Sequence, residues 1–210
     1  MAGLATTRPA ARRPLKSRGS IVVRRVAAAL AAWKVPPNAI SIAGVTAAAA
    51  GAAALIGASE VDGIGQAALL AGAALAVQLR LLCNLLDGLV AVEGGLGTPD
   101  GELFNEVPDR LADSLLLVAA GYAASVPELG WAAALAAALT AYVRALGGAL
   151  GQPQDFSGLM SKPRRMALLT TACLGAVATL DVLAVAVAVV FAGSLATAGG
   201  RLARLRRTLR

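Results

Sequence analysis

Long apolar runs, each about as long as a lipid bilayer is thick, make up most of this chain. The chain has 210 residues, and runs of 20 or more, dominated by Ala, Leu, Val and Gly, recur between residues 39 and 198. A helix needs about 20 consecutive apolar residues to cross the hydrocarbon core. In lipid, only helices and closed barrels satisfy all of their own backbone hydrogen bonds. We therefore predict an all-α integral membrane protein.

The composition excludes an ordinary soluble domain. Hydrophobic residues make up 58% of the chain and charged residues 15%, and the mean hydropathy is +0.71. A soluble domain has about 45–50% apolar and about 25% charged residues. Aromatic residues make up only 3%, so the apolar side chains are small and aliphatic, as in closely packed membrane helices.

The apolar runs predict six membrane spans. They cover about 39–58, 65–92, 102–124 and 131–150, and the run 166–198 is divided into two short spans at Asp181. Before them, residues 20–34 have apolar side chains at helical spacing beside basic ones, which predicts an amphipathic helix lying in the membrane interface. We expect residues 1–19 to be a disordered basic segment, 20–198 a single membrane domain, and 199–210 a basic cytoplasmic tail.

The basic residues indicate an orientation rather than a nucleic-acid partner. The net charge is +7, from 19 basic and 12 acidic residues. The basic residues outside the spans gather before residue 35, at Lys162–Arg165 and after residue 200, which six alternating spans place on one side. The positive-inside rule makes that side cytoplasmic, in a cell membrane with both termini inside. No aromatic residues are interleaved with the charges, so contact with anionic lipid headgroups is favoured over nucleic acid.

A polar cluster interrupts the apolar background between residues 84 and 113. Asn84 and Asp87 are three residues apart, and Asn105, Asp109 and Asp113 are spaced by four, so each set lies on one helix face. A Gly-rich loop joins the two sets. Acidic residues at lipid depth are expensive and usually functional. Oxygen ligands suit hard cations, and Mg²⁺ commonly bridges carboxylates to phosphates. We predict a site for Mg²⁺ or Mn²⁺ and a phosphate group, near the cytoplasmic face.

Four basic residues are expected close to that site. Arg144 lies inside a predicted span. Lys162, Arg164 and Arg165 lie at the end of the polar loop, directly before the apolar run that starts at residue 166. We predict that they bind the phosphate of an acceptor or of a lipid. An equally strong alternative for Arg164 and Arg165 is contact with headgroups.

Structural ion pairs are an alternative explanation of the acidic residues. Asp87, Asp109 and Asp113 could pair with three arginines, which are Arg80, Arg110 and Arg144. The clustering of carboxylates with amides and glycines favours metal and phosphate chemistry instead. The chain has two cysteines and no histidine, so neither a disulfide framework nor a Cys/His metal site is indicated.

The same cluster resembles the signature of the CDP-alcohol phosphotransferase family, which reads D-x2-D-G-x2-A-R-x8-G-x3-D-x3-D. This chain preserves every spacing and matches five of the eight positions, namely Asp87, Gly88, Ala91, Gly101 and Asp109. It departs at the other three, with Asn84, Val92 and Asn105. With Asp113 and the segment D-F-S-G-L-M-S-K-P-R-R, it is similar to a bacterial branch that carries Asn at both positions.

The resemblance implies a role for each matched residue. Asn84, Asp87, Asn105, Asp109 and Asp113 would hold one or two Mg²⁺ or Mn²⁺ ions. Asp109 would also take the proton from an acceptor hydroxyl. The small residues Gly88, Ala91 and Gly101 would line a cytidine diphosphate site. A phosphatidyl group would then pass from a CDP-diacylglycerol-like donor to a small alcohol, CMP would leave, and the enzyme would be a homodimer in phospholipid synthesis.

Two other functions remain open. Asn84 and Asn105 remove two negative charges, and Val92 cannot contact phosphate, so the chain could be a catalytically degenerate relative that serves as a scaffold or cation-binding subunit. Arg80 or another cation could replace the missing arginine at 92, and Glu106 or Asp113 the missing charge. The spacing Asp109-x3-Asp113 is also half of the aspartate-rich pattern of intramembrane prenyltransferases, which ranks well below the first hypothesis.

Overall fold

Helices are the regular elements of the described part of the chain. The structure, a computed structural model, describes residues 20–210; the predicted disordered segment 1–19 lies outside them. The helices are α1 (Ile21–Ala32), α2 (Pro37–Ala58), α3 (Gly63–Val92), α4 (Gly101–Ala123), α5 (Pro127–Ala149), α6 (Lys162–Gly175) and α7 (Asp181–Thr208). Each predicted helix is found, and all but the last lie within about five residues of their expected bounds; α7 ends at Thr208 instead of near residue 198.

Proline and positive φ angles set several of the boundaries. Pro37 and Pro127 occupy the first turns of α2 and α5, where the fixed φ and missing N–H of proline cost nothing. Lys34 and Ser125, which precede these starts, have φ of 54° and 58°. That left-handed conformation ends the preceding helix and redirects the chain.

Four helices are long and apolar enough to cross a membrane: α2, α3, α5 and α7. The other two predicted spans exist as helices but have a different character. α4 carries acidic residues in its first half, and α6 has only 14 residues. A multi-pass membrane protein is therefore supported, while the arrangement with six spans stays a prediction. α7 runs on to Thr208, so most of the expected basic tail is the end of this helix.

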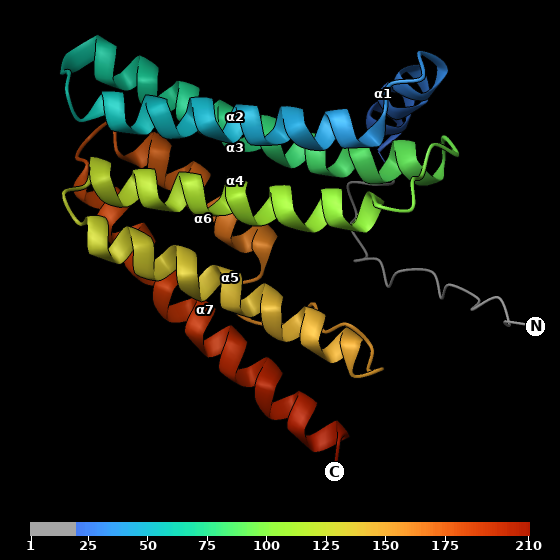
Figure 1. The fold of residues 1–210 in the computed structure, drawn as a ribbon. Coiled ribbons are helices and arrows are strands. Elements are labelled where there is room, and N and C mark those ends of the chain that lie inside the picture. Colours follow the sequence, from blue (N-terminus) through green and yellow to red (C-terminus); the bar gives the residue numbers. More distant parts are fainter. Residues whose placement is uncertain (1–19) are drawn as a thin grey trace, which may run out of the picture.

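Small residues bring the helices close together. α2 packs along α3 and α4, and α5 packs along α4 and α7 (Figure 1). At the crossing of α4 and α5, a Cβ added to Gly121 would lie 2.7 Å from Cα of Gly130, so the two backbones meet without intervening side chains. Small residues allow this close approach in membrane helices.

The two ends of the helical bundle differ. α1 and the loop between α3 and α4 lie at one end, and the short turns from α2 to α3 and from α4 to α5 lie at the other (Figure 1). Ala27 of α1 is buried against Leu86, Leu89 and Val90 in the last turns of α3. The polar residues of α3 and α4 therefore lie towards the end that α1 covers.

Candidate active site

A cavity of about 700 Å³ opens at the end of the bundle that α1 covers. Its walls include most of the predicted site residues, which are Asn84, Asp87, Gly88, Ala91, Gly101, Asn105, Asp109, Arg144, Lys162 and Arg165. Asp113 and Arg164 do not line it. The fold thus brings together side chains from four helices that the sequence places up to about 80 residues apart.

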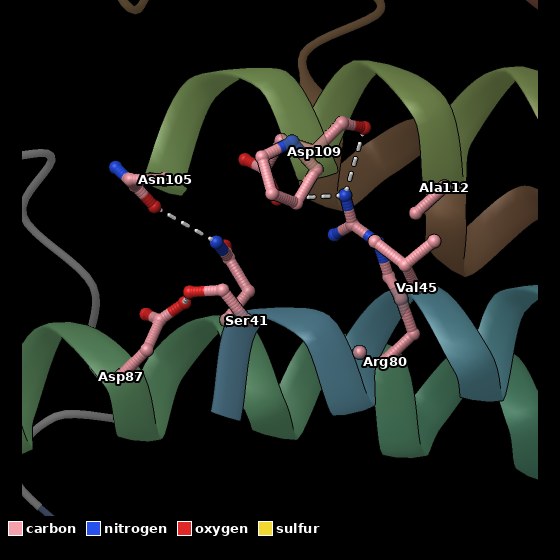
Figure 2. Close-up of a pocket in the computed structure, with 10 residues that line it drawn as sticks. Ser41, Val45, Arg80, Asp87, Asn105, Asp109 and Ala112 are labelled. Carbon is pink, nitrogen blue, oxygen red and sulfur yellow. Dashed lines mark hydrogen bonds and ion pairs between the residues drawn. The ribbon is translucent and has the colours of Figure 1, made fainter. Parts of the chain in front are cut away.

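The motif residues of α3 face α2 and α4. Asp87 is buried and accepts a hydrogen bond of 2.6 Å from the Ser41 hydroxyl of α2. One turn earlier, the Asn84 amide donates to Oδ1 of Asn105 on α4 over 3.2 Å. Figure 2 shows Ser41 directed at Asp87 and Asn105 directed across the gap between the helices. The two asparagines therefore connect α3 and α4 directly.

Asp109 of α4 is bonded by two cations. The Arg80 guanidinium, which is 1% exposed, donates to Oδ1 of Asp109 over 2.8 Å and to its backbone oxygen over 3.1 Å (Figure 2). The Lys162 ammonium donates to Oδ2 of the same carboxylate and to Oδ1 of Asn84 over 2.9 Å. Lys162 is the first residue of α6, so this short helix brings its charge into the motif.

Asp113 is enclosed one turn deeper along α4. Its side chain is 4% exposed and lies 2.7 Å from Arg80 and 2.8 Å from Arg165, each of which is 1% exposed. The structural ion pairing considered as an alternative thus applies to Asp109 and Asp113, which share Arg80. Asp113 is directed into helix packing, away from the cavity, and cannot easily supply the charge that the asparagines lack.

Arg144 of α5 is hydrogen-bonded to other side chains of the protein. Its guanidinium donates over 2.6 Å to both oxygens of Glu106 and over 2.6 Å to Gln154, and it lies 5.3 Å from the ring centroid of Phe156. Glu106, like Asp113, is therefore already neutralised. Arg164 of α6 is exposed and donates to backbone oxygens of the loop before that helix, and it does not line the cavity.

The loop before α6 is tied to the end of α7. Asp155 accepts hydrogen bonds from Ser157 and from Arg204. Partial burial alone would raise the pKa of Asp155, but these hydrogen bonds and the Arg204 charge outweigh it and hold the pKa below its usual range. Arg201, one turn earlier, donates to the backbone oxygens of Ser157 and Thr140. The C-terminal helix therefore closes one wall of the cavity.

The donor set fits one divalent cation. A small cavity of about 10 Å³, lined by Asn84, Asp87, Asn105 and Asp109, lies beside the larger one, and such a volume holds about one water molecule. Two carboxylates and two amide oxygens suit Mg²⁺ when phosphate oxygens complete the shell. Among the described side chains, no three acidic, His or Cys residues converge on one point. The site therefore offers two carboxylates, those of Asp87 and Asp109.

Several residues of the cavity were not predicted from the sequence. Ser41 and Arg110 line it, and so does Arg201 near the C-terminus. Arg110 directly follows Asp109, and this position next to the motif could have identified it as a cavity residue. Ser41 lies 46 residues from Asp87, and only the packing of α2 on α3 brings them together. Arg80, proposed as a substitute phosphate ligand, is instead buried between Asp109 and Asp113.

Comparisons with known proteins identify the fold. No protein-family model matches the chain, and no curated protein matches its sequence. Among solved structures, it is similar to phosphatidylinositol phosphate synthase of Mycobacterium tuberculosis with CDP-DAG bound, with 21% identity and a TM-score of 0.74 over 89% of this chain and 94% of that one. The structure of that synthase with manganese and citrate has 22% identity and a TM-score of 0.73, over 88% of this chain and 88% of that one. The apo form has 22% identity and a TM-score of 0.68, over 85% of this chain and 93% of that one. The chain shares the fold of this synthase.

Proposed function

We propose that this chain is a membrane transferase that moves a phosphatidyl group from a CDP-diacylglycerol-like donor to an alcohol and releases CMP. The observation that carries the proposal is one cavity that Asp87 and Asp109 line together with Gly88, Ala91 and Gly101. The similar synthase structures, one with CDP-DAG and one with manganese and citrate, support the same class of donor and a divalent cation.

The small residues account for nucleotide binding. No atom lies within 4 Å of a Cβ built on Gly88, although Gly88 lines the cavity. A ligand can therefore approach the α3 backbone closely at this point. Gly101 at the start of α4 faces the same space, so a cytidine diphosphate group would lie between the two helices.

The carboxylates and basic residues account for the transfer. Asn84, Asp87, Asn105 and Asp109 would hold one Mg²⁺ or Mn²⁺, which neutralises the diphosphate and stabilises the charge on the departing CMP. The acceptor oxygen forms a bond to the lipid-side phosphorus and gives its proton to Asp109, while the bond from that phosphorus to the CMP oxygen breaks. Arg110 is a half-buried cation on the cavity wall, 3.4 Å from Glu106 and 3.6 Å from Asp109, and would contact the phosphate in place of the motif arginine, whose position Val92 occupies here.

A non-catalytic scaffold is the second candidate, and one observation favours it. Both oxygens of Asp109 are bonded by Arg80 and Lys162, so the proposed base must exchange a cation for the acceptor hydroxyl. Nothing in the described residues favours a prenyltransferase, because Asp113 is directed away from the cavity that Asp109 lines.

CMP release separates these candidates. Purified protein would be incubated with CDP-diacylglycerol, Mg²⁺ or Mn²⁺ and a panel of polyols, amino alcohols and phosphorylated alcohols. We expect metal-dependent CMP release with at least one acceptor, lost in Asp109→Asn and kept in Asp62→Asn, whose carboxylate is exposed at the other end of the bundle. No release with any metal or acceptor would leave the scaffold as the better account.

Orientation and assembly complete the proposal. With six spans, the cavity, both termini and the basic residues outside the spans share one side of the membrane. We place that side in the cytoplasm, because the positive-inside rule favours basic residues there. We propose a homodimer because the family resemblance suggests one and the small residues on the helix faces permit it. Protease accessibility of the α5–α6 loop in sealed vesicles tests the first, and light scattering of the detergent-purified protein tests the second.

A further inference from the structure

The first turn of α6 and the polar face of α4 are paired residue by residue. Lys162 and Arg165 are three residues apart on α6, and Asp109 and Asp113 are four apart on α4, so each pair lies on one face. Lys162 bonds Asp109, and Arg165 bonds Asp113 over 2.8 Å. Lys162, Arg165 and Asp109 all line the cavity, and Asp113 does not.

Lys162 joins the same two helices that a metal ion would join. Its ammonium contacts Oδ1 of Asn84 on α3 and Oδ2 of Asp109 on α4, and both residues occupy positions of the metal-binding motif. The side chain is 16% exposed, so little water competes for these contacts. The positive charge of Lys162 therefore lies between the motif residues of α3 and those of α4.

The ammonium also accounts for both asparagines. Asn84 accepts from Lys162 with Oδ1 and donates with Nδ2 to Oδ1 of Asn105, which makes a continuous hydrogen-bonded chain. A carboxylate at position 84 could not donate to Asn105, and two adjacent carboxylates would repel each other. The amides therefore suit a site in which a lysine has taken over part of the neutralising charge.

A count of buried charges limits the number of ions. The cluster contains three carboxylates, Asp87, Asp109 and Asp113, and four cations, Arg80, Arg110, Lys162 and Arg165, of which Arg110 is shared with Glu106. The cations therefore at least balance these carboxylates before any ion binds. One divalent ion would be balanced by the diphosphate of a donor, whereas a second would leave uncompensated positive charge in a buried site, which is strongly unfavourable.

We infer that Lys162, held by Asn84 and Asp109, takes the position of a second divalent ion, so that the site binds one ion together with the nucleotide. This inference rests on the proposed function and deepens it. It assigns Lys162 to the metal site instead of to an acceptor phosphate. It also explains why the motif can lose two carboxylates and keep its spacing.

Counting bound Mn²⁺ tests the inference without turnover. Mn²⁺ would be titrated into detergent-purified full-length protein, with and without CMP, and bound ions counted by electron paramagnetic resonance. We expect one isolated ion per chain, bound more tightly with CMP, in the wild type and in Lys34→Met, which changes an exposed lysine. In Lys162→Met we expect a second ion and the spectrum of a coupled pair.

Two ions in the wild type, or one ion with unchanged affinity in Lys162→Met, would overturn the inference. The wild-type count needs no variant, so the test survives if Lys162→Met fails to fold, and Lys162→Arg should keep the count at one. Two ions with CMP release would contradict the inference and leave the proposed function standing. No bound ion in any of these proteins would contradict the metal-dependent function itself.

Discussion

Asp113 is expected to matter for stability more than for metal binding. Its carboxylate lies 2.7 Å from Arg80 and 2.8 Å from Arg165, and all three side chains are at most 4% exposed. Asp113→Asn keeps the shape, but Arg165 loses its carboxylate partner and Arg80 keeps Asp109 as its remaining one. Breaking a buried ion pair by removing one partner costs about 3–5 kcal/mol.

The expected shift in melting temperature follows from that figure. For a chain of this size, the melting temperature falls by about 2–4 °C for each kcal/mol of lost stability. Asp113→Asn should therefore melt roughly 6–20 °C below the wild type. Asp155→Asn is the matched control, because the Asp155–Arg204 pair has a similar distance of 2.8 Å but is 31% and 48% exposed. Exposed pairs contribute only about 0–1 kcal/mol.

The buried thiol of Cys173 provides the assay. In a Cys83→Ala background, heating in detergent with a thiol-reactive fluorophore reports when the core opens. Asp113→Asn should melt well below Asp155→Asn, and adding Arg165→Met should restore part of the loss because it removes one unpaired charge. Equal melting temperatures for the two single variants would refute the assignment of Asp113 to a buried structural network.

Two glycines should respond in opposite ways to the same substitution. Gly121→Val should lower the melting temperature by several degrees, because even a Cβ there would lie 2.7 Å from Cα of Gly130 and push α4 from α5; unchanged melting would contradict this packing. Gly88→Val should leave stability almost unchanged, because nothing lies within 4 Å of a Cβ there, but should abolish binding of CDP-diacylglycerol by filling the cavity. Gly72→Val, also with open space around its Cβ, should bind the donor normally.

The helices were predictable because lipid imposes a length on them. The apolar runs placed the starts of α2 and α5 within about four residues of Pro37 and Pro127, where these helices begin. The break before Asp181 was expected from one charged residue in an apolar run, and α7 begins there. The division also predicted a short helix before Asp181, and α6 has 14 residues. What the runs could not indicate was that α6 begins at Lys162, inside the basic segment, and that α7 continues through the basic tail to Thr208.

The site was predictable where it depends on local spacing. Asp87 and Asp109, with the matched small residues, line one cavity, as expected from their positions along two helices. The partners of the charges were harder to foresee. Arg80, Lys162 and Asp113 are distant in sequence, and the choice between phosphate ligand and buried counter-ion is made by helix packing. No local pattern distinguishes Arg165, which is buried, from its exposed neighbour Arg164.

The most direct test of the central claim is whether this protein forms CMP and a phosphatidyl alcohol in equal amounts. CDP-diacylglycerol, Mn²⁺ and an acceptor found in the panel would be supplied, CMP measured by chromatography and the lipid product by mass spectrometry. The account predicts one phosphatidyl alcohol per CMP, abolished by a chelator and by Asp109→Asn but not by Asp62→Asn. CMP without a lipid product, or release that persists in Asp109→Asn, would contradict it.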